Sequence, residues 1–407
     1  MSFDPRQIRL QFPLLTGNGG LHYLDNAATS QIHQSALGAL VRHETTARAN
    51  VQRGSYPLAE AASAAYAEAR RQAAAFLNAP DADEVVFTSG ATAALNLAAA
   101  SLGASLRPGD EVLVSMAEHH SNLLPWQQLQ TRRGITLRLL PLTDEGRLDL
   151  AALPDCVGER CRLIAVTHAS NVTGAVTDVA AVVAAARRVG ARVLLDGAQR
   201  VPHGPVDVQA LGVDFYAFSG HKCFGPGGIG VFWGRADLLA GMPPFMTGGG
   251  MVQRLDPQGI EPPVFLDPPA RFEAGTPPIA PAVGLGAALA WMAELPWESI
   301  ERHERMLTER LLRGLAAVDG LRLLGPANLA QRLPVVSFAI DGIHPHDLCQ
   351  VLGERGVALR GGHHCARPLL AHLGEEGATR ASIALYNDVA DIDALLNGLD
   401  AAIGVLR

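Results

Sequence analysis

Short apolar runs recur through the middle of the chain, and each ends in small or polar residues. Amphipathic stretches such as residues 92–105 and 179–189 separate most of these runs and have the spacing of helices. Strands that alternate with helices are typical of a mainly parallel sheet with helices on both faces. The pattern predicts strands over residues 84–88, 111–115, 136–140, 163–167, 192–196, 215–218 and 229–233. Because the last two are too close for a parallel crossover, the last strand is predicted to be antiparallel.

The two ends of the chain are patterned differently. Residues 8–15 predict a short docking helix, and residues 58–77 predict a long alanine-rich helix. A region rich in proline and glycine, residues 242–281, interrupts the alternation. A helix over 297–318 then leads to a smaller α/β unit with a final helix and strands over 335–340, 357–359 and 380–385.

These patterns predict an α/β chain with a seven-stranded, mainly parallel sheet and a smaller C-terminal α/β domain. We expect a segment over residues 1–20 that packs on the small domain. A large domain that contains the seven-stranded sheet is expected over 21–290, and the small domain over 291–407.

Composition narrows the class of protein. The 407 residues carry a net charge of −7 and no basic run, which argues against nucleic acid and anionic membrane as partners. The start lacks the apolar core of a signal peptide, and no apolar run reaches membrane-spanning length, so a cytoplasmic protein is expected. The five scattered cysteines include no C-x-x-C pair, which argues against a disulfide framework and a zinc site.

Lys222 lies in a small-residue stretch, residues 219–230, between two apolar runs. Desolvation at such a place lowers the pKa of the amine and frees it to form a Schiff base with an aldehyde cofactor. The alternative is a surface lysine in a glycine-rich turn. Residues 225–230 also fit G-x-G-x-x-G, but a predicted strand follows where a dinucleotide site needs a helix.

Other residues at predicted strand ends point to the same crevice, because ligands bind at the carboxyl ends of strands in open α/β sheets. Residues 89–92 open a helix with small residues and a hydroxyl, which suits a phosphate or an ordinary N-cap. One of the two histidines in residues 118–122 could stack on a ring or move a proton, and Asp196 could pair with a protonated pyridine nitrogen. Together with Gln199 and Lys222, these residues predict a pyridoxal phosphate site.

The second unit carries Cys365 in a stretch of glycines and histidines, residues 360–368. This cysteine is a candidate nucleophile, with a small buried apolar residue as the alternative. The flanking glycines predict a mobile, exposed loop. Arg380 could bind a substrate carboxylate or form an ordinary ion pair.

Taken in order, the motifs resemble those of the fold-type I cysteine desulfurases, and of the SufS and CsdA group in particular. They are residues 24–28 (LDNAA), 118–120 (EHH), 170–174 (SNVTG), 196–199 (DGAQ), 219–222 (SGHK), 271–276 (RFEAGT) and 360–366 (RGGHHCA).

The resemblance implies a homodimer in which Lys222 holds pyridoxal phosphate, Asp196 pairs with the ring nitrogen and His119 stacks on the ring. It further implies that Gln199 meets the ring hydroxyl. Its phosphate-binding residues would be Thr92, Ser219 and His221, with Thr276 reaching the phosphate of the neighbouring subunit. Its substrate-binding residues would be Asn171, Arg360 and Arg380.

The implied activity converts L-cysteine to L-alanine and leaves a persulfide on Cys365, for delivery to a sulfur acceptor similar to SufE or CsdE. Selenocysteine lyase or cysteine sulfinate desulfinase activity is the alternative within this chemistry. An aminotransferase or epimerase of the same fold is a more distant one, which Cys365 disfavours. A sulfur-binding scaffold without catalysis is disfavoured by the presence of Lys222, Asp196 and His119.

Three positions depart from the family's pattern. Gln52 stands where a histidine is usual, Ala91 where a threonine is common, and Cys223 where a leucine is usual. Cys223 follows the lysine, and adjacent strand residues face opposite sides. Cys223 is therefore expected to pack away from the cofactor as a small apolar filler.

Overall fold

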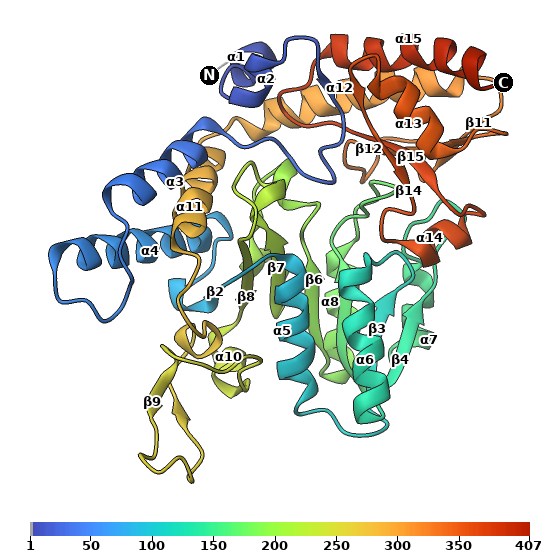
Figure 1. The fold of residues 1–407 in the computed structure, drawn as a ribbon. Coiled ribbons are helices and arrows are strands. Elements are labelled where there is room, and N and C mark those ends of the chain that lie inside the picture. Colours follow the sequence, from blue (N-terminus) through green and yellow to red (C-terminus); the bar gives the residue numbers. More distant parts are fainter. Residues whose placement is uncertain (1–2) are drawn as a thin grey trace.

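The computed structural model describes residues 3–407. Their largest sheet has seven strands in the order β2-β8-β7-β6-β5-β3-β4 (Figure 1). The strands are β2 (Val85–Thr88), β3 (Glu111–Ser115), β4 (Thr136–Leu140), β5 (Cys161–Thr167), β6 (Arg192–Asp196), β7 (Phe215–Ser219) and β8 (Gly230–Gly234). β8 lies antiparallel between β2 and β7, and the remaining neighbours are parallel. The predicted sheet and its antiparallel last strand are confirmed.

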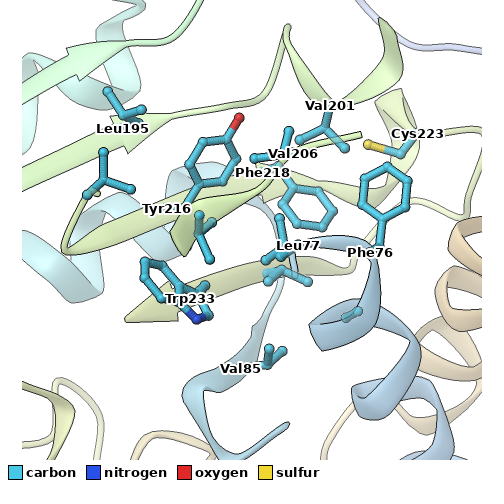
Figure 2. Packing of buried hydrophobic residues seen from close by; sticks show 14 of the residues in the cluster. Phe76, Leu77, Val85, Leu195, Val201, Val206, Tyr216, Phe218, Cys223 and Trp233 are labelled. Carbon is cyan, nitrogen blue, oxygen red and sulfur yellow. The ribbon is translucent and has the colours of Figure 1, made fainter. Parts of the chain in front are cut away.

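Side chains of each strand alternate between two apolar layers, as a pleated strand requires. Phe215 and Ala217 of β7 pack with α5 (Ala91–Gly103) and α6 (Leu124–Arg133) on one face. Tyr216 and Phe218 pack on the other face, where α8 (Val179–Val189) and α4 (Pro57–Phe76) cover the sheet. Figure 2 shows this second layer. The strands are buried on both faces, which explains their continuous apolar sequences.

Two helices next to the sheet were not predicted. They are α3 (Gln34–Thr46) and α11 (Ile279–Ala293), and α11 packs against α3 and α4. A Cβ at Gly286 would lie 2.7 Å from Cα of Ala69, so α11 and α4 approach closely at a glycine. Within residues 3–407 no single helix is long and apolar enough to span a membrane. α11 and the following α12 (Trp297–Ala316) pass the length and composition test only together, with an 89° bend between them.

The segment before α11 contains short elements instead of a regular layer. They are α10 (Ala236–Gly241), the two-stranded arm β9 (Val252–Arg254) and β10 (Val264–Phe265), and the single turn η6 (Ala270–Phe272). In Figure 1 the arm with β9 projects from the rest of the molecule. The predicted interruption over residues 242–281 agrees with these elements, except that α11 already begins at Ile279.

A second sheet forms the C-terminal unit, with the order β11-β12-β15-β14 and antiparallel pairing throughout. Its strands are β11 (Leu321–Leu324), β12 (Val335–Ile340), β14 (Arg360–Gly362) and β15 (Ala378–Ser382), and its helices are α12, α13 (Pro345–Gly353), α14 (Arg367–His372) and α15 (Val389–Leu406).

Two strand predictions in this unit were right in place but differ from the structure in pairing or extent. The strand predicted over 357–359 is β13 (Val357–Ala358), which pairs with β1 (His22–Tyr23) outside the four-stranded sheet. The strand predicted over 380–385 ends at Ser382. Pairing stops there because Pro334, opposite Ile383, accepts the N–H of Ile383 but has no N–H of its own to donate in return.

The docking helix predicted over residues 8–15 is wrong. The chain forms two short helices, α1 (Pro5–Arg9) and α2 (Pro13–Gly17), because Phe12 is extended before Pro13. The ring of Phe12 lies 4.6 Å from that of Tyr386 and 5.7 Å from that of Phe224, so it contacts both units. Arg9 pairs with Asp391 of α15 at 3.3 Å. The domain limits 1–20, 21–290 and 291–407 stay a prediction, and residues 1–2 lie outside the described residues.

Candidate active site

A cavity of about 290 Å³ lies where β2, β3, β5, β6 and β7 end. Of the twelve site residues predicted from the sequence, eleven line it: Thr92, His119, Asn171, Asp196, Gln199, Ser219, His221, Lys222, Arg360, Cys365 and Arg380. Thr276 is exposed, lies outside the cavity and accepts a 3.5 Å hydrogen bond from Nδ2 of Asn50. The cavity is also lined by residues that were not singled out, among them Ala27, Ser121, Thr167 and His364.

Lys222 ends the turn η5 (Gly220–Lys222), which follows β7 directly. The turn is tight: a Cβ at Gly220 would lie 2.8 Å from a methyl carbon of Ile229. Burial lowers the pKa of the Lys222 amine to about 8, and the nearby Asp196 carboxylate opposes this shift. The amine is therefore partly neutral near physiological pH.

Asp196 is buried at the end of β6. One carboxyl oxygen, Oδ1, accepts the N–H of Ala198 at 3.0 Å. Burial raises the pKa of this carboxyl, while Lys222 lowers it. Within residues 3–407, no cationic side chain lies within the 4.0 Å of an ion pair with Asp196. A buried acid with so few partners can accept a hydrogen bond from a cationic ligand.

The start of α5 lines the cavity through Ala91 and Thr92. Ser219 accepts the N–H of Ala91 through Oγ at 2.8 Å, and Thr92 lies 2.8 Å from the hydroxyl of Ser121. Gly90 has a φ of +147°, and a Cβ at Gly230 of the adjacent strand would lie 2.5 Å from Cα of Gly90. Free N–H groups, hydroxyls and the positive end of a helix favour an anion here.

His119 precedes the turn η2 (His120–Asn122) and caps it. Its Nδ1 accepts the N–H of Ser121 at 3.1 Å, so the proton of the neutral ring is on Nε2. Burial lowers the pKa of His119 to about 4, with a smaller contribution from Lys222. The ring is therefore neutral at physiological pH and suited to stacking.

Arg360 and Arg380 both pair with Asp25, an acid to which no role was assigned from the sequence. Asp25 pairs with Nη2 of Arg360 at 2.9 Å and with Nη2 of Arg380 at 3.3 Å. Arg380 is buried and also donates to the carbonyl of Asn171, but its Nε has no partner among the described residues. Asp25 lies in the motif of residues 24–28, which was recognised without a function for its acid.

Cys365 is half-buried beside these groups, and the expectation of an exposed loop is wrong. Residues 360–362 form β14, and the N–H of His120 donates to the carbonyl of Cys365 at 2.7 Å. Nδ2 of Asn171 holds the preceding carbonyl, that of His364, at 2.7 Å. His364 and Cys365 have φ values of +49° and +54°. Cys365 also lines two further cavities, of about 530 and 810 Å³.

Cys223 is fully buried and packs away from the cavity, as predicted. In Figure 2 its sulfur lies among Val201, Phe76 and Phe218. Burial raises the pKa of this thiol. The reasoning behind the prediction was wrong, because Cys223 follows a turn and not a strand. Of the other departures, Ala91 lines the cavity and Gln52 does not.

Comparison with known proteins gives consistent results over the whole chain. Residues 22–395 match the family model "Aminotransferase class-V". A cysteine desulfurase of Dickeya dadantii is 45% identical over 401 residues, which cover 97% of this chain and 95% of that protein.

Two of the similar solved structures show how far the likeness extends. The cysteine desulfurase CsdA from Escherichia coli has a TM-score of 0.92 at 39% identity, with all of both chains covered. A variant of C-DES with glycine covalently linked to its PLP cofactor has a TM-score of 0.81 at 26% identity, covering 96% of this chain and 98% of the other. The predicted fold-type I architecture and the family resemblance are confirmed. The chain belongs to the class-V aminotransferase family, and within it to the cysteine desulfurases of the SufS and CsdA type.

Proposed function

We propose that this chain uses pyridoxal phosphate to remove sulfur from L-cysteine, releasing L-alanine and leaving the sulfur as a persulfide on Cys365. One observation carries this proposal: a single cavity is lined by the amine-bearing Lys222, the acid Asp196 and the thiol-bearing Cys365. Each has a separate chemical task, and the cavity brings the three tasks together.

The residues of the cavity fit the cofactor. The phosphate would lie at the start of α5, with Thr92, Ser219 and His221 around it. The buried Asp196, which lacks a cationic partner among residues 3–407, would accept the protonated ring nitrogen, and Gln199 would meet the ring hydroxyl. The neutral His119 would stack on the ring. When bound, pyridoxal phosphate supplies an aldehyde that captures amines and a ring that accepts an electron pair.

We assign substrate binding to the part of the cavity that Arg360 and Arg380 line. The buried Nε of Arg380 lacks a partner among the described residues, so the guanidinium retains unused donor capacity for a carboxylate. Arg360 and Asn171 would complete this site. Because Asp25 already neutralises part of the charge of both arginines, it also sets how strongly they attract the substrate.

The remaining steps use Lys222 and Cys365. The neutral amine of Lys222 would remove the proton from the substrate α-carbon. The Cys365 thiolate would form a bond to the substrate sulfur as the carbon–sulfur bond breaks, which yields the persulfide. The electron pair of the broken bond would stay with the substrate carbon, which takes up a proton to become the methyl group of L-alanine. The two further cavities at Cys365 would admit the thiol of an acceptor protein similar to SufE or CsdE.

A homodimer is part of the proposal. Large apolar side chains are exposed in and before the β9–β10 arm, including Phe245, Met246, Leu255 and Ile260. A second copy would cover them, and Thr276 would reach the phosphate of the neighbouring subunit from its exposed position. Light scattering of the purified protein measures the oligomeric state directly.

Selenocysteine lyase or cysteine sulfinate desulfinase activity is the second candidate, since both would use the same cavity. The deciding experiment measures L-alanine from the three substrates with wild type and Lys222→Ala. We expect a visible cofactor absorbance band in wild type, highest turnover with L-cysteine, and loss of turnover in Lys222→Ala. Normal alanine release by this variant would contradict the proposal.

A further inference from the structure

Glu118 is a buried acid next to the cavity that the proposed function does not use. It directly precedes His119 but does not line the cavity. Its Oε1 accepts the N–H of Thr167 at 2.9 Å and a short hydrogen bond from the hydroxyl of Ser115. Its Oε2 accepts from Nδ2 of Asn122 at 2.6 Å.

These three donors belong to different elements. Ser115 ends β3, and Thr167 ends β5, the strand paired with it. Asn122 ends the turn η2 and also accepts the indole N–H of the buried Trp126 on α6 at 3.1 Å. The carboxyl group therefore joins two strand ends to the turn and, through Asn122, to the helix after it.

The turn held in this way contacts both sides of the cavity. On the cofactor side, the ring of His119 accepts the N–H of Ser121, whose hydroxyl contacts Thr92 at 2.8 Å. On the nucleophile side, the N–H of His120 donates to the carbonyl of Cys365 at 2.7 Å. His119 and His120 are consecutive, so a displacement of the turn moves both contacts together.

We propose that Glu118 is a positioning residue that sets, through one turn, both the orientation of the His119 ring and the place of the Cys365 backbone. The inference rests on the proposed function and deepens it. Burial raises the pKa of the Glu118 carboxyl to about 8, and the hydrogen bonds from Ser115, Asn122 and Thr167 oppose this rise because they favour the carboxylate. The carboxylate can accept all three donors at once. A glutamine side chain has the same shape, but its NH2 group would face one of these donors and break at least one of the three bonds.

The test uses the cofactor-loaded protein with Glu118→Gln and a matched control, Glu84→Gln. Glu84 is also buried and accepts two hydrogen bonds, from Nε1 of Trp233 and from the N–H of Ala236, but it does not line the cavity. Two readouts are recorded: visible circular dichroism of the bound cofactor, and the single-turnover rate of persulfide formation on Cys365. The dissociation constant for L-cysteine is measured alongside them.

We expect Glu118→Gln to change the dichroism band and to slow persulfide formation by about tenfold or more, which corresponds to about 1.4 kcal/mol. Binding of L-cysteine should weaken by much less, because Arg380 and Asn171 do not touch Glu118. Glu84→Gln should leave both readouts at the wild-type level.

Wild-type values of both readouts in Glu118→Gln would overturn the inference, as would a change in only one of them. If Glu118→Gln does not fold, Trp126→Phe tests the same chain of contacts, because it removes the indole N–H donated to Asn122 together with part of the buried ring. It should shift both readouts in the same direction by a smaller amount, and no shift would overturn the inference. Absence of persulfide in wild type would contradict the proposed function instead.

Discussion

The amine of Lys222 has a pKa of about 8 because it is buried, compared with 10.5 for an ordinary lysine. Only the neutral amine attacks an aldehyde, so capture of the cofactor should slow as the pH falls through 8. We expect the rate at which cofactor-free protein captures pyridoxal phosphate to be half-maximal near pH 8, as measured by stopped-flow absorbance. A rate that first levels off above pH 10 would mean that the amine is solvated.

Cys365, which lines the cavity, and Cys223, which follows Lys222 but packs in the apolar core, give a matched pair of variants. Sulfur in L-cysteine needs a nucleophile to take it, whereas selenium and sulfinate are better leaving groups. Cys365→Ala should therefore nearly abolish L-alanine release from L-cysteine and retain substantial release from selenocysteine or cysteine sulfinate.

Cys223→Ala is the control for this loss, because Cys223 is fully buried among apolar residues away from the cavity. It should keep most activity on all three substrates, with cofactor content matched by absorbance. An equal loss on all substrates in Cys365→Ala would make that residue structural, and loss of persulfide in Cys223→Ala would give the second thiol a role.

Among the elements, the contact between β8 and the start of α5 determines the shape of the anion site. A methyl group at Gly230 would lie 2.5 Å from Cα of Gly90 and 2.7 Å from the carbonyl oxygen of Phe218, both backbone atoms. Gly230→Ala should separate α5 from Ser219 and weaken cofactor binding by about tenfold or more, at a stability cost of about 1–3 kcal/mol.

Fluorescence titration of the cofactor-free protein with pyridoxal phosphate measures this effect. Gly227→Ala is the control, because a Cβ there meets no atom within 4 Å. Equal affinities of the two variants would show that the helix start tolerates the added methyl group.

Whether an element can be predicted from the sequence depends on how its residues are buried. The central strands have continuous apolar centres because both faces of the sheet are covered, so β3 and β6 stand out from the chain around them. α11 lies in a run of alanines and glycines whose apolar residues surround the helix, which hides its period. The strand end after Ser382 could not be predicted, because only a partner far away in sequence, Pro334, decides where pairing stops.

The site residues also fall into two groups, those that a local sequence pattern identifies and those whose role depends on distant partners. Asp196, Ser219 and Lys222 could be grouped from sequence because each ends or directly follows an apolar strand. Asp25 and Glu118 acquire their roles from partners on other elements, and no local pattern identifies such partners. The prediction that Cys365 is exposed was wrong for the same reason. The N–H of His120 and Nδ2 of Asn171, which lie outside its loop, donate to the carbonyls of Cys365 and His364.

At the scale of the whole molecule, Phe12 connects parts that are distant in sequence. Its ring lies within 6 Å of those of His33, Phe224, Trp291 and Tyr386. Phe12→Ala should therefore lower the free energy of unfolding by about 3–5 kcal/mol. The midpoint of urea unfolding measures the loss, with Leu10→Ala as the control because Leu10 is 62% exposed. Similar midpoints for the two variants would show that the N-terminal segment contributes little.

The position of β8 also has a consequence for how the protein is made. β8 is the last of the seven strands to be synthesised, yet it lies between β2 and β7 and pairs Trp233 with Val85. Contacts between such distant parts of a chain form slowly. β2, which pairs with β8 at the edge of the sheet, therefore has no strand partner on the nascent chain until β8 emerges from the ribosome. The cofactor pocket, which needs α5 and the lysine turn on either side of β8, is completed only after that insertion.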